Sequence, residues 1–241
     1  LYVIVNANGA LFLLVKIFNV EPAIAMGIMI LAACPGGPTS NLVTFLAKGD
    51  VALSVTLTAV NSVITIFTIP LIVNFGLSEF MVGDMSIAAP TSEIMKSLAI
   101  VIAIPLAIGM TIRRYAPGAA AKMDLPVRIA STLILVVVIV GLCIKEKDNL
   151  ADYFAKSWVI VLCLNIATMT VGFIAAKLAR LNFKQALCIC IESGNQNGTL
   201  AIHVAAVSLL RPDFAIAAAV YSLLMYGTAL VPIWIGNRRK G

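Results

Sequence analysis

The stretch Cys188–Thr199 contains the residues whose types and spacing best fit ion chemistry. It reads Cys-Ile-Cys-Ile-Glu-Ser-Gly-Asn-Gln-Asn-Gly-Thr, so an apolar run reaches Glu192, breaks into polar and glycine residues, and resumes at Leu200. Carboxylates and amides inside a membrane crossing are costly unless partners satisfy them. Glycines there free backbone carbonyls, which a bilayer tolerates only beside protein or a water-filled cavity. We interpret the stretch as a broken membrane helix that binds an ion; the alternative is a packing kink with buried polar residues.

A second break of the same kind lies earlier in the chain. Cys34–Asn41 reads Cys-Pro-Gly-Gly-Pro-Thr-Ser-Asn and interrupts the apolar run Ala23–Leu46. The next apolar run, Val51–Phe75, carries polar residues on roughly one helical face: Ser54, Thr58, Asn61, Ser62 and Thr65. Ser54 and Thr58 are four residues apart, so a helix would place them one turn above each other.

The two breaks together offer a shell of oxygens for a cation. Sodium is a hard cation that prefers such ligands. The available side-chain oxygens are those of Ser40, Asn41, Ser54, Thr58, Glu192 and Gln196, and unwound carbonyls around Ser193–Asn195 can complete the shell. The half-helices that restart after each break would point backbone N–H groups at the same region, which suits a small organic anion. A cation and an anion held mid-membrane indicate coupled transport.

Composition defines the class of protein that must position these residues. The chain of 241 residues is 61% hydrophobic and 12% charged, with a mean hydropathy of +1.04. A soluble domain carries about twice that charge. The alternation of a β-barrel is absent, so we predict an all-α polytopic membrane protein. The net charge is +6, and the basic residues that cause it lie between the apolar runs. We interpret them as determinants of membrane orientation, not as a nucleic-acid-binding surface.

Eight crossings are expected in one membrane domain that covers residues 1–241. They are Leu1–Phe18, Ala23–Leu46, Val51–Phe75, Ser97–Ile112, Val127–Ile144, Trp158–Leu178, Ala186–Leu210 and Phe214–Ile235. The two broken crossings run in opposite directions, which is typical of an inverted repeat. Residues 1–75 would be the remainder of the first repeat and residues 76–241 the second. In the second repeat three crossings precede the broken one, whereas in the first repeat only one does. If the repeats match, two more helices precede Leu1, so we expect ten in the full protein.

Basic residues predict the orientation. Clusters between alternate crossings share one side, which the positive-inside rule makes cytoplasmic: Arg113, Arg114, Lys122 and Arg128; Lys177, Arg180 and Lys184; Arg238, Arg239 and Lys240. Residue 1 and the C-terminus would then be cytoplasmic, in a multi-pass protein of the cell (inner) membrane.

Three motifs follow one another in an order typical of a known family. They are Cys34-Pro35-Gly36-Gly37 with Ser40-Asn41, Lys48-Gly49-Asp50 before Ala52-Leu53-Ser54, and Glu192-x-Gly194-x-Gln196-Asn197. This pattern resembles the bile acid:sodium symporter family, and the likeness covers the chain from about Pro22 onward. The resemblance implies ten helices in two inverted repeats, with discontinuous helices that cross. It also implies sodium as the coupling ion, one or two per cycle, and no organic cofactor.

The resemblance implies two sodium sites, matched residue by residue. The first would comprise Ser40, Asn41, Ser54, Thr58 and Glu192, and the second Glu192 and Gln196 with backbone oxygens of Ser193 and Asn195. A glutamine that the family supplies to the second site has no counterpart near Val3, where Asn6 is the nearest substitute. Thr39, Asn197, Gly198 and Thr199 are expected to bind the substrate, because they lie where the two half-helices restart.

The prediction is a sodium-coupled symporter that carries a small organic anion by alternating access. The anion would be a monocarboxylate such as a 2-oxo acid or a pantoate-like compound, or a bile-acid-like steroid; bile acids are disfavoured because Met225-Tyr226 replaces a polar pair of the last helix. The alternatives are a proton-coupled or arsenite-type carrier and a passive anion channel. An intramembrane enzyme is excluded, since every aspartate lies in a loop and there is a single histidine. Beyond substrate and bilayer, no obligatory protein partner is expected.

Overall fold

The computed structural model describes residues 15, 20–81, 91–145 and 150–238. The first expected crossing, Leu1–Phe18, therefore lies outside the described residues except for Val15. The described elements are all helical: α2 Pro22–Ala33, α3 Pro38–Leu46, α4 Val51–Phe80, α5 Thr91–Leu98, η1 Ala99–Ala103, α6 Ile104–Tyr115, α7 Pro117–Lys145, α8 Leu150–Leu178, α9 Phe183–Gly194, α10 Gly198–His203, η2 Val204–Ser208 and α11 Pro212–Arg238. The labels η1 and η2 denote short π-helical turns. The predicted all-α class is confirmed.

Four described stretches are long and apolar enough to cross a membrane: Val51–Phe80, Thr91–Tyr115, Phe154–Leu178 and Pro212–Arg238. They contain the expected third, fourth, sixth and eighth crossings. Two shorter apolar helices, Pro22–Ala33 and Gly198–Ser208, belong to the broken crossings. The expected fifth crossing lies within the helix α7. The chain is thus a multi-pass helical membrane protein, while the number of eight crossings and the inverted repeat stay predictions.

Both predicted breaks are present, at the positions where glycine and proline cluster. The helix α2 ends at Ala33, and α3 begins at Pro38 after an extended Gly37 with φ −84° and ψ 164°. Proline suits a first helical turn because its missing N–H would have no partner there. In the second crossing, α9 ends at Gly194 and α10 begins at Gly198.

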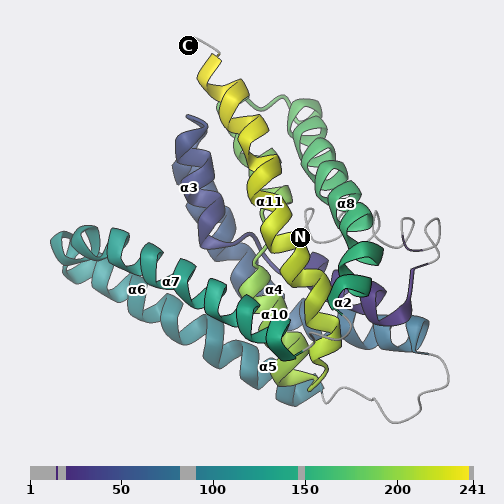
Figure 1. Cartoon of the computed structure of the whole chain (residues 1–241). Helices are drawn as coiled ribbons and strands as arrows, with labels where there is room; N and C mark the ends of the chain where they lie inside the picture. Colours follow the sequence, from purple (N-terminus) through teal and green to yellow (C-terminus); the bar gives the residue numbers. More distant parts are fainter. Residues whose placement is uncertain (1–14, 16–19, 82–90, 146–149, 239–241) are drawn as a thin grey trace.

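The core of the bundle forms where α11 packs against both α2 and α8 (Figure 1). On α11 the buried face is mostly small residues, Ala215, Ala217, Ala218 and Ala219, beside the large Phe214 and Tyr221. Small residues let helix backbones approach closely, which is how helices gain contact area where lipid is as apolar as protein. Away from this core, α6 and α7 lie side by side and extend out of the bundle, and α6 has no buried residue (Figure 1).

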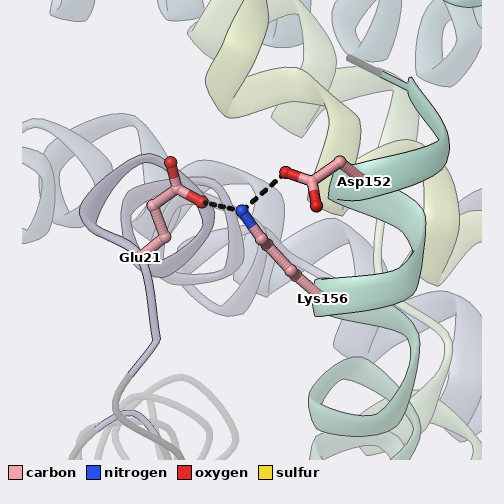
Figure 2. Close-up of polar contacts among 3 residues, drawn as sticks. All are labelled: Glu21, Asp152 and Lys156. Carbon is pink, nitrogen blue, oxygen red and sulfur yellow. Dashed lines mark hydrogen bonds and ion pairs between the residues drawn. The ribbon is translucent and has the colours of Figure 1, made fainter.

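Contacts at one end of the bundle join the starts of α2 and α8. Lys156 binds Glu21 with Nζ 3.2 Å from Oε2 and also pairs with Asp152 one turn earlier on α8 (Figure 2). The Lys156 and Glu21 side chains are 49% and 42% exposed, so solvent screens their charges and the pair contributes little to stability. The ion pair shows that the starts of α2 and α8 lie at the same end of the bundle. This agrees with the predicted alternation, in which both crossings begin on the same side of the membrane.

Contacts at the opposite end join different segments. The N–H of Asp50, before α4, donates to the carbonyl of Lys184 in the first turn of α9, at 3.2 Å. The side-chain amide of Asn237 near the end of α11 donates to the carbonyl of Leu46 at the end of α3, at 2.8 Å. These ends belong to the side that the basic residues mark as cytoplasmic in the predicted orientation.

The close approach of α2 to α11 depends on Gly27, since a Cβ added there would overlap the carbonyl oxygen of Phe214. We expect Gly27→Ala to force the two helices apart and to destabilise the protein by about 1–3 kcal/mol, the usual cost of overpacking. Thermal unfolding of the purified protein measures this. Gly109→Ala on α6 is the matched control, because no described atom lies within 4 Å of its Cβ position. Equal melting temperatures for both variants would contradict this packing.

Candidate functional site

The two unwound segments cross and pair with each other. The N–H of Gly37 donates to the carbonyl of Asn195 at 3.1 Å, and the N–H of Asn197 donates to the carbonyl of Pro35 at 2.9 Å. Gly36 and Gln196 therefore face each other as an isolated antiparallel bridge. Backbone groups released from a helix must find partners inside a membrane protein, and here each break supplies them to the other.

The carboxylate of Glu192 lies beside this crossing and is almost fully buried, with 1% of the residue exposed. It accepts hydrogen bonds from three hydroxyls. Ser40 Oγ lies 2.6 Å from Oε1, Ser54 Oγ donates to the same oxygen, and Thr58 Oγ1 lies 3.2 Å from Oε1 and 3.1 Å from Oε2. These donors come from α3 and α4, so Glu192 joins the second break to the helices around the first.

Asn41 completes this group. Its Oδ1 lies 2.7 Å from Ser54 Oγ, whose single proton is shared between this amide oxygen and Glu192, and 3.5 Å from Thr58 Oγ1. The structure thus brings together all five residues of the predicted first sodium site. We call them the Glu192 cluster: Ser40, Asn41, Ser54, Thr58 and Glu192.

Every side chain of the Glu192 cluster offers an oxygen atom as a possible cation ligand, and the formal charge of the cluster is the negative charge of Glu192. Among the described residues, no lysine, arginine or histidine forms an ion pair with Glu192. Burial of a carboxylate without a cation is costly even when hydroxyls donate to it. The cluster therefore has the charge and the ligand types that a hard cation would satisfy.

Gly36 shapes the cluster by having no side chain. A Cβ added to Gly36 would overlap Glu192 Oε2, whereas a Cβ on the neighbouring Gly37 would keep ordinary contacts at 3.5 Å. The backbone of the first break thus lies directly against the carboxylate. The two adjacent glycines have different roles, which the sequence alone does not reveal.

The second predicted cation set is less closely gathered. Gln196 Nε2 donates to the carbonyl of Ser193 at 3.1 Å, and the carbonyl of Asn195 already accepts from Gly37. Gln196 Oε1 is buried and has no hydrogen-bond partner among the described residues, nor have Asn195 Oδ1 and Nδ2. The hydrogen bonds of Glu192 in the described residues all go to the first set. Ser193 and Gln196 thus lie in contact, but among the described residues neither forms a hydrogen bond with the carboxylate of Glu192.

The residues expected to bind substrate lie where α3 and α10 begin, and several of their groups are already engaged. Asn197 Oδ1 accepts from the N–H of Leu200 at 3.1 Å and so caps α10. A Cβ on Gly198 would overlap Ser222 Oγ, so this glycine lets α10 pack against α11. Thr39 is half-buried and Thr199 is exposed. Asn197 and Gly198 therefore have structural roles that the sequence analysis did not anticipate.

Two buried residues that the sequence analysis missed hold the second break. Asn165 Nδ2 on α8 and Tyr221 Oη on α11 both donate to the carbonyl of Gly194, each at 2.8 Å. A role for Asn165 could have been predicted from the sequence, because an uncharged polar residue within the apolar sixth crossing needs a hydrogen-bond partner. Tyr221 carried none, since tyrosines are common in apolar helices.

His203 is half-buried on α10, and its Nε2 lies 3.0 Å from Ser97 Oγ on α5. This contact fits the role of a packing residue. Among the described residues, no group of three or more histidine, cysteine, aspartate or glutamate side chains gathers as a metal site.

The fold and this site define a multi-pass helical membrane protein built around two broken, crossing helices with a buried carboxylate between them. A model of the Sodium Bile acid symporter family matches residues 2–153. The chain belongs to this family, as its motifs predicted.

Known relatives match most of the chain. It is 28% identical over 227 residues to the probable sodium/metabolite cotransporter BASS1, chloroplastic, of Oryza sativa subsp. japonica, covering 92% of this chain and 54% of that protein. It is 27% identical over 219 residues to the uncharacterized sodium-dependent transporter YocS of Bacillus subtilis, covering 90% and 66%. It is 26% identical over 228 residues to the human (Homo sapiens) ileal sodium/bile acid cotransporter, covering 91% and 63%. The chain thus spans between half and two thirds of the length of these relatives.

Capping by Asn197 gives a prediction about stability. Asn197→Ala removes the acceptor for the N–H of Leu200, and loss of such a cap destabilises a protein by about 0.5–2 kcal/mol. Asn197→Ser retains a capping oxygen but lacks the amide N–H groups, so it should melt close to the wild type. Thermal unfolding of the three proteins measures the effect. If the alanine and serine variants melt alike, Asn197 does not act as a cap.

Proposed function

We propose that this chain is the transport domain of a sodium-coupled symporter that carries a small organic anion by alternating access. The observation that carries the proposal is the Glu192 cluster, in which side chains from both breaks converge on one buried carboxylate. The family and the names of the relatives support sodium as the coupling ion. No step of this cycle requires an enzymatic reaction or an organic cofactor.

The composition of the cluster favours a sodium ion over a proton. A proton would occupy a single carboxylate oxygen and needs one acceptor, whereas the cluster gathers hydroxyls of Ser40, Ser54 and Thr58 and the amide oxygen of Asn41 around the same point. These hydroxyls now donate to Glu192. With a cation between them, they could rotate and offer lone pairs instead. Proton coupling, arsenite-type transport and a passive anion channel remain the alternatives.

A second sodium ion is proposed at the second break, with Glu192, the carbonyls of Ser193 and Asn195, and Gln196. Support comes from Gln196 Oε1, which is buried and without a partner among the described residues. Each carbonyl oxygen has two lone pairs, and among the described residues each accepts one hydrogen bond, which leaves one lone pair for a cation. Because the carboxylate is bound toward the first set, we expect the first ion to bind more tightly.

The substrate is proposed to bind where α3 and α10 begin, at Thr39, Asn197, Gly198 and Thr199. The N–H groups of Asn197 and Gly198 donate to Pro35 and Gln196, but those of Thr39 and Thr199 have no hydrogen-bond partner among the described residues. A small carboxylate would suit two such donors without an arginine. The class proposed is a monocarboxylate such as a 2-oxo acid or a pantoate-like compound, or a bile-acid-like steroid. Relatives described as metabolite and bile acid cotransporters support this range.

The proposed location is the cell (inner) membrane, with residue 1 and the C-terminus in the cytoplasm. The apolar helices and the clusters of basic residues support this orientation. The lipid bilayer supplies the environment, and the proposal needs no obligatory protein partner.

The central test is uptake of carboxylates into vesicles with and without a sodium gradient. We expect Glu192→Gln to reduce sodium-driven uptake by at least about tenfold, because it removes the charge that a buried cation needs. Glu93→Gln is the matched control, since Glu93 is an exposed carboxylate at the start of α5. Sodium-driven uptake by Glu192→Gln at the wild-type rate would refute the proposed cation site. Sodium-independent flux in the wild type would favour a channel.

The two neighbouring glycines provide a sharper test. Gly36→Ala should displace the carboxylate of Glu192 and weaken sodium binding, while Gly37→Ala adds the same methyl group where ordinary contacts allow it. The measurement is the sodium concentration that half-maximally raises the melting temperature of purified protein, with choline chloride holding ionic strength constant. We expect a rise of about tenfold or more for Gly36→Ala and less than about twofold for Gly37→Ala. Equal shifts would show that close contact with Gly36 does not shape the site.

A further inference from the structure

We propose that Asn165 and Tyr221 act as positioning residues that hold the second break in the shape required for cation binding. We call the pair the Gly194 clamp, because both side chains bind the carbonyl of Gly194. The inference rests on the proposed sodium coupling and adds two residues, on α8 and α11, that belong to neither cation set nor to the proposed substrate site.

The clamp is a closed, buried triangle of hydrogen bonds. Asn165 Nδ2 and Tyr221 Oη each lie 2.8 Å from Gly194 O, and they lie 3.0 Å from each other. Asn165 is 0% and Tyr221 1% exposed. Asn165 Nδ2 thus lies within hydrogen-bond distance of both the carbonyl and the phenol, and the phenol donates its own proton to the carbonyl. Both lone pairs of Gly194 O are thereby used.

The clamp replaces the backbone hydrogen bond that the carbonyl of Gly194 would accept in a continuous helix. Gly194 ends α9, so its carbonyl has no partner in a following helical turn. The N–H of Gly198, which a continuous helix would direct to Gly194, donates to Gln196 instead, at 3.0 Å. An unpaired carbonyl at this depth would be costly, and it would be free to turn toward any cation nearby. Two side chains from other helices therefore fix its direction.

Gly194 lies between the groups that the proposed function uses. Glu192 is two residues earlier, and the carbonyls of Ser193 and Asn195 flank Gly194 on each side. Because successive peptide planes share a Cα, fixing the carbonyl of Gly194 restricts the directions of both neighbours. Close packing from α8 adds to this: a Cβ on Gly194 would overlap Met169, and a Cβ on Gly172 would overlap Ser193 Oγ. The break is thus held by α8 and α11 on one side and by the Glu192 cluster on the other.

A purely structural role for the pair makes a different prediction. If the clamp only joined α8 to α11, its loss would lower stability or the amount of folded protein without changing the affinity for sodium. A positioning role predicts that sodium affinity falls while the protein still folds. The half-saturation concentration of sodium, measured separately from the maximal rate, therefore distinguishes the two.

The experiment uses Tyr221→Phe, which removes one hydroxyl and keeps the ring. We expect the sodium concentration for half-maximal uptake to rise about three- to tenfold, the range for loss of one buried hydrogen bond, with the maximal rate changed less than about twofold. Tyr115→Phe is the matched control, because Tyr115 is 77% exposed at the end of α6. Sodium-dependent thermal stabilisation of the purified protein should show the same shift, and its absence would assign the effect to another step.

A double-mutant cycle tests whether both side chains act on one carbonyl. Asn165→Leu is the second variant, and the effect of Asn165→Leu with Tyr221→Phe should be smaller than the product of the single effects. Independent, multiplicative effects would overturn the clamp, as would an unchanged sodium half-saturation in Tyr221→Phe. If Asn165→Leu does not fold, Asn165→Gln, which keeps the amide but moves it by one carbon, takes its place, and the Tyr221→Phe result decides the inference by itself.

The outcome also separates this inference from the function on which it rests. A wild-type protein that neither takes up carboxylates with sodium nor is stabilised by sodium would refute the proposed function. A wild type that responds to sodium, with clamp variants that respond at the same concentrations, would refute the clamp alone.

Discussion

The need to pair backbone groups where two helices are broken is the constraint on which the rest of this structure depends. Inside a bilayer, an unwound segment has no water to satisfy its N–H and carbonyl groups. Here the two unwound segments satisfy each other through the bonds Gly37 to Asn195 and Asn197 to Pro35. That crossing explains why glycine stands at position 36, where a larger residue would overlap the carboxylate. It also explains why residues 152 positions apart, Ser40 and Glu192, lie in contact.

The burial of Glu192 gives this crossing its chemistry. Hydroxyls from α3 and α4 stabilise the carboxylate by hydrogen bonds, but none of them brings a positive charge. A cation that binds here would stabilise this arrangement relative to any other in which the same oxygens are apart, because a ligand shifts an equilibrium by its difference in affinity between states. Energy from a sodium gradient would enter the protein through that difference. Under the proposed function, the asymmetry between the two sets of oxygens would set the order in which two sodium ions bind.

The sequence predicted those parts of the structure that depend on local chemistry. Both breaks were predicted because glycine, proline and polar residues cluster inside apolar runs, and the five members of the Glu192 cluster were predicted by the family motifs. The bounds of the crossings were less well predicted. For example, the fourth was expected to begin at Ser97, but α5 begins at Thr91, because a helix continues past its apolar part into exposed residues such as Glu93.

Packing between distant helices was not accessible to sequence reasoning. The roles of Gly198 against Ser222, and of Asn165 and Tyr221 at Gly194, depend on how α8, α10 and α11 lie against one another. Asn197 shows a different limit. Its position at the start of a half-helix was recognised, but an amide there can serve as a cap or as a ligand, and only the geometry shows that Oδ1 is used as a cap.

The two backbone hydrogen bonds across the breaks also have a mechanical consequence. They fasten four half-helices, α2 with α3 and α9 with α10, at one point, so that sliding any of them past the others would break bonds that nothing else replaces. These four segments should therefore travel as one rigid body, whatever rearrangement the protein undergoes. The helix α6, by contrast, has no buried residue, and its main contacts among the described elements are with α7 and η1. Relative displacement between the crossing and α6 would leave these two backbone hydrogen bonds intact.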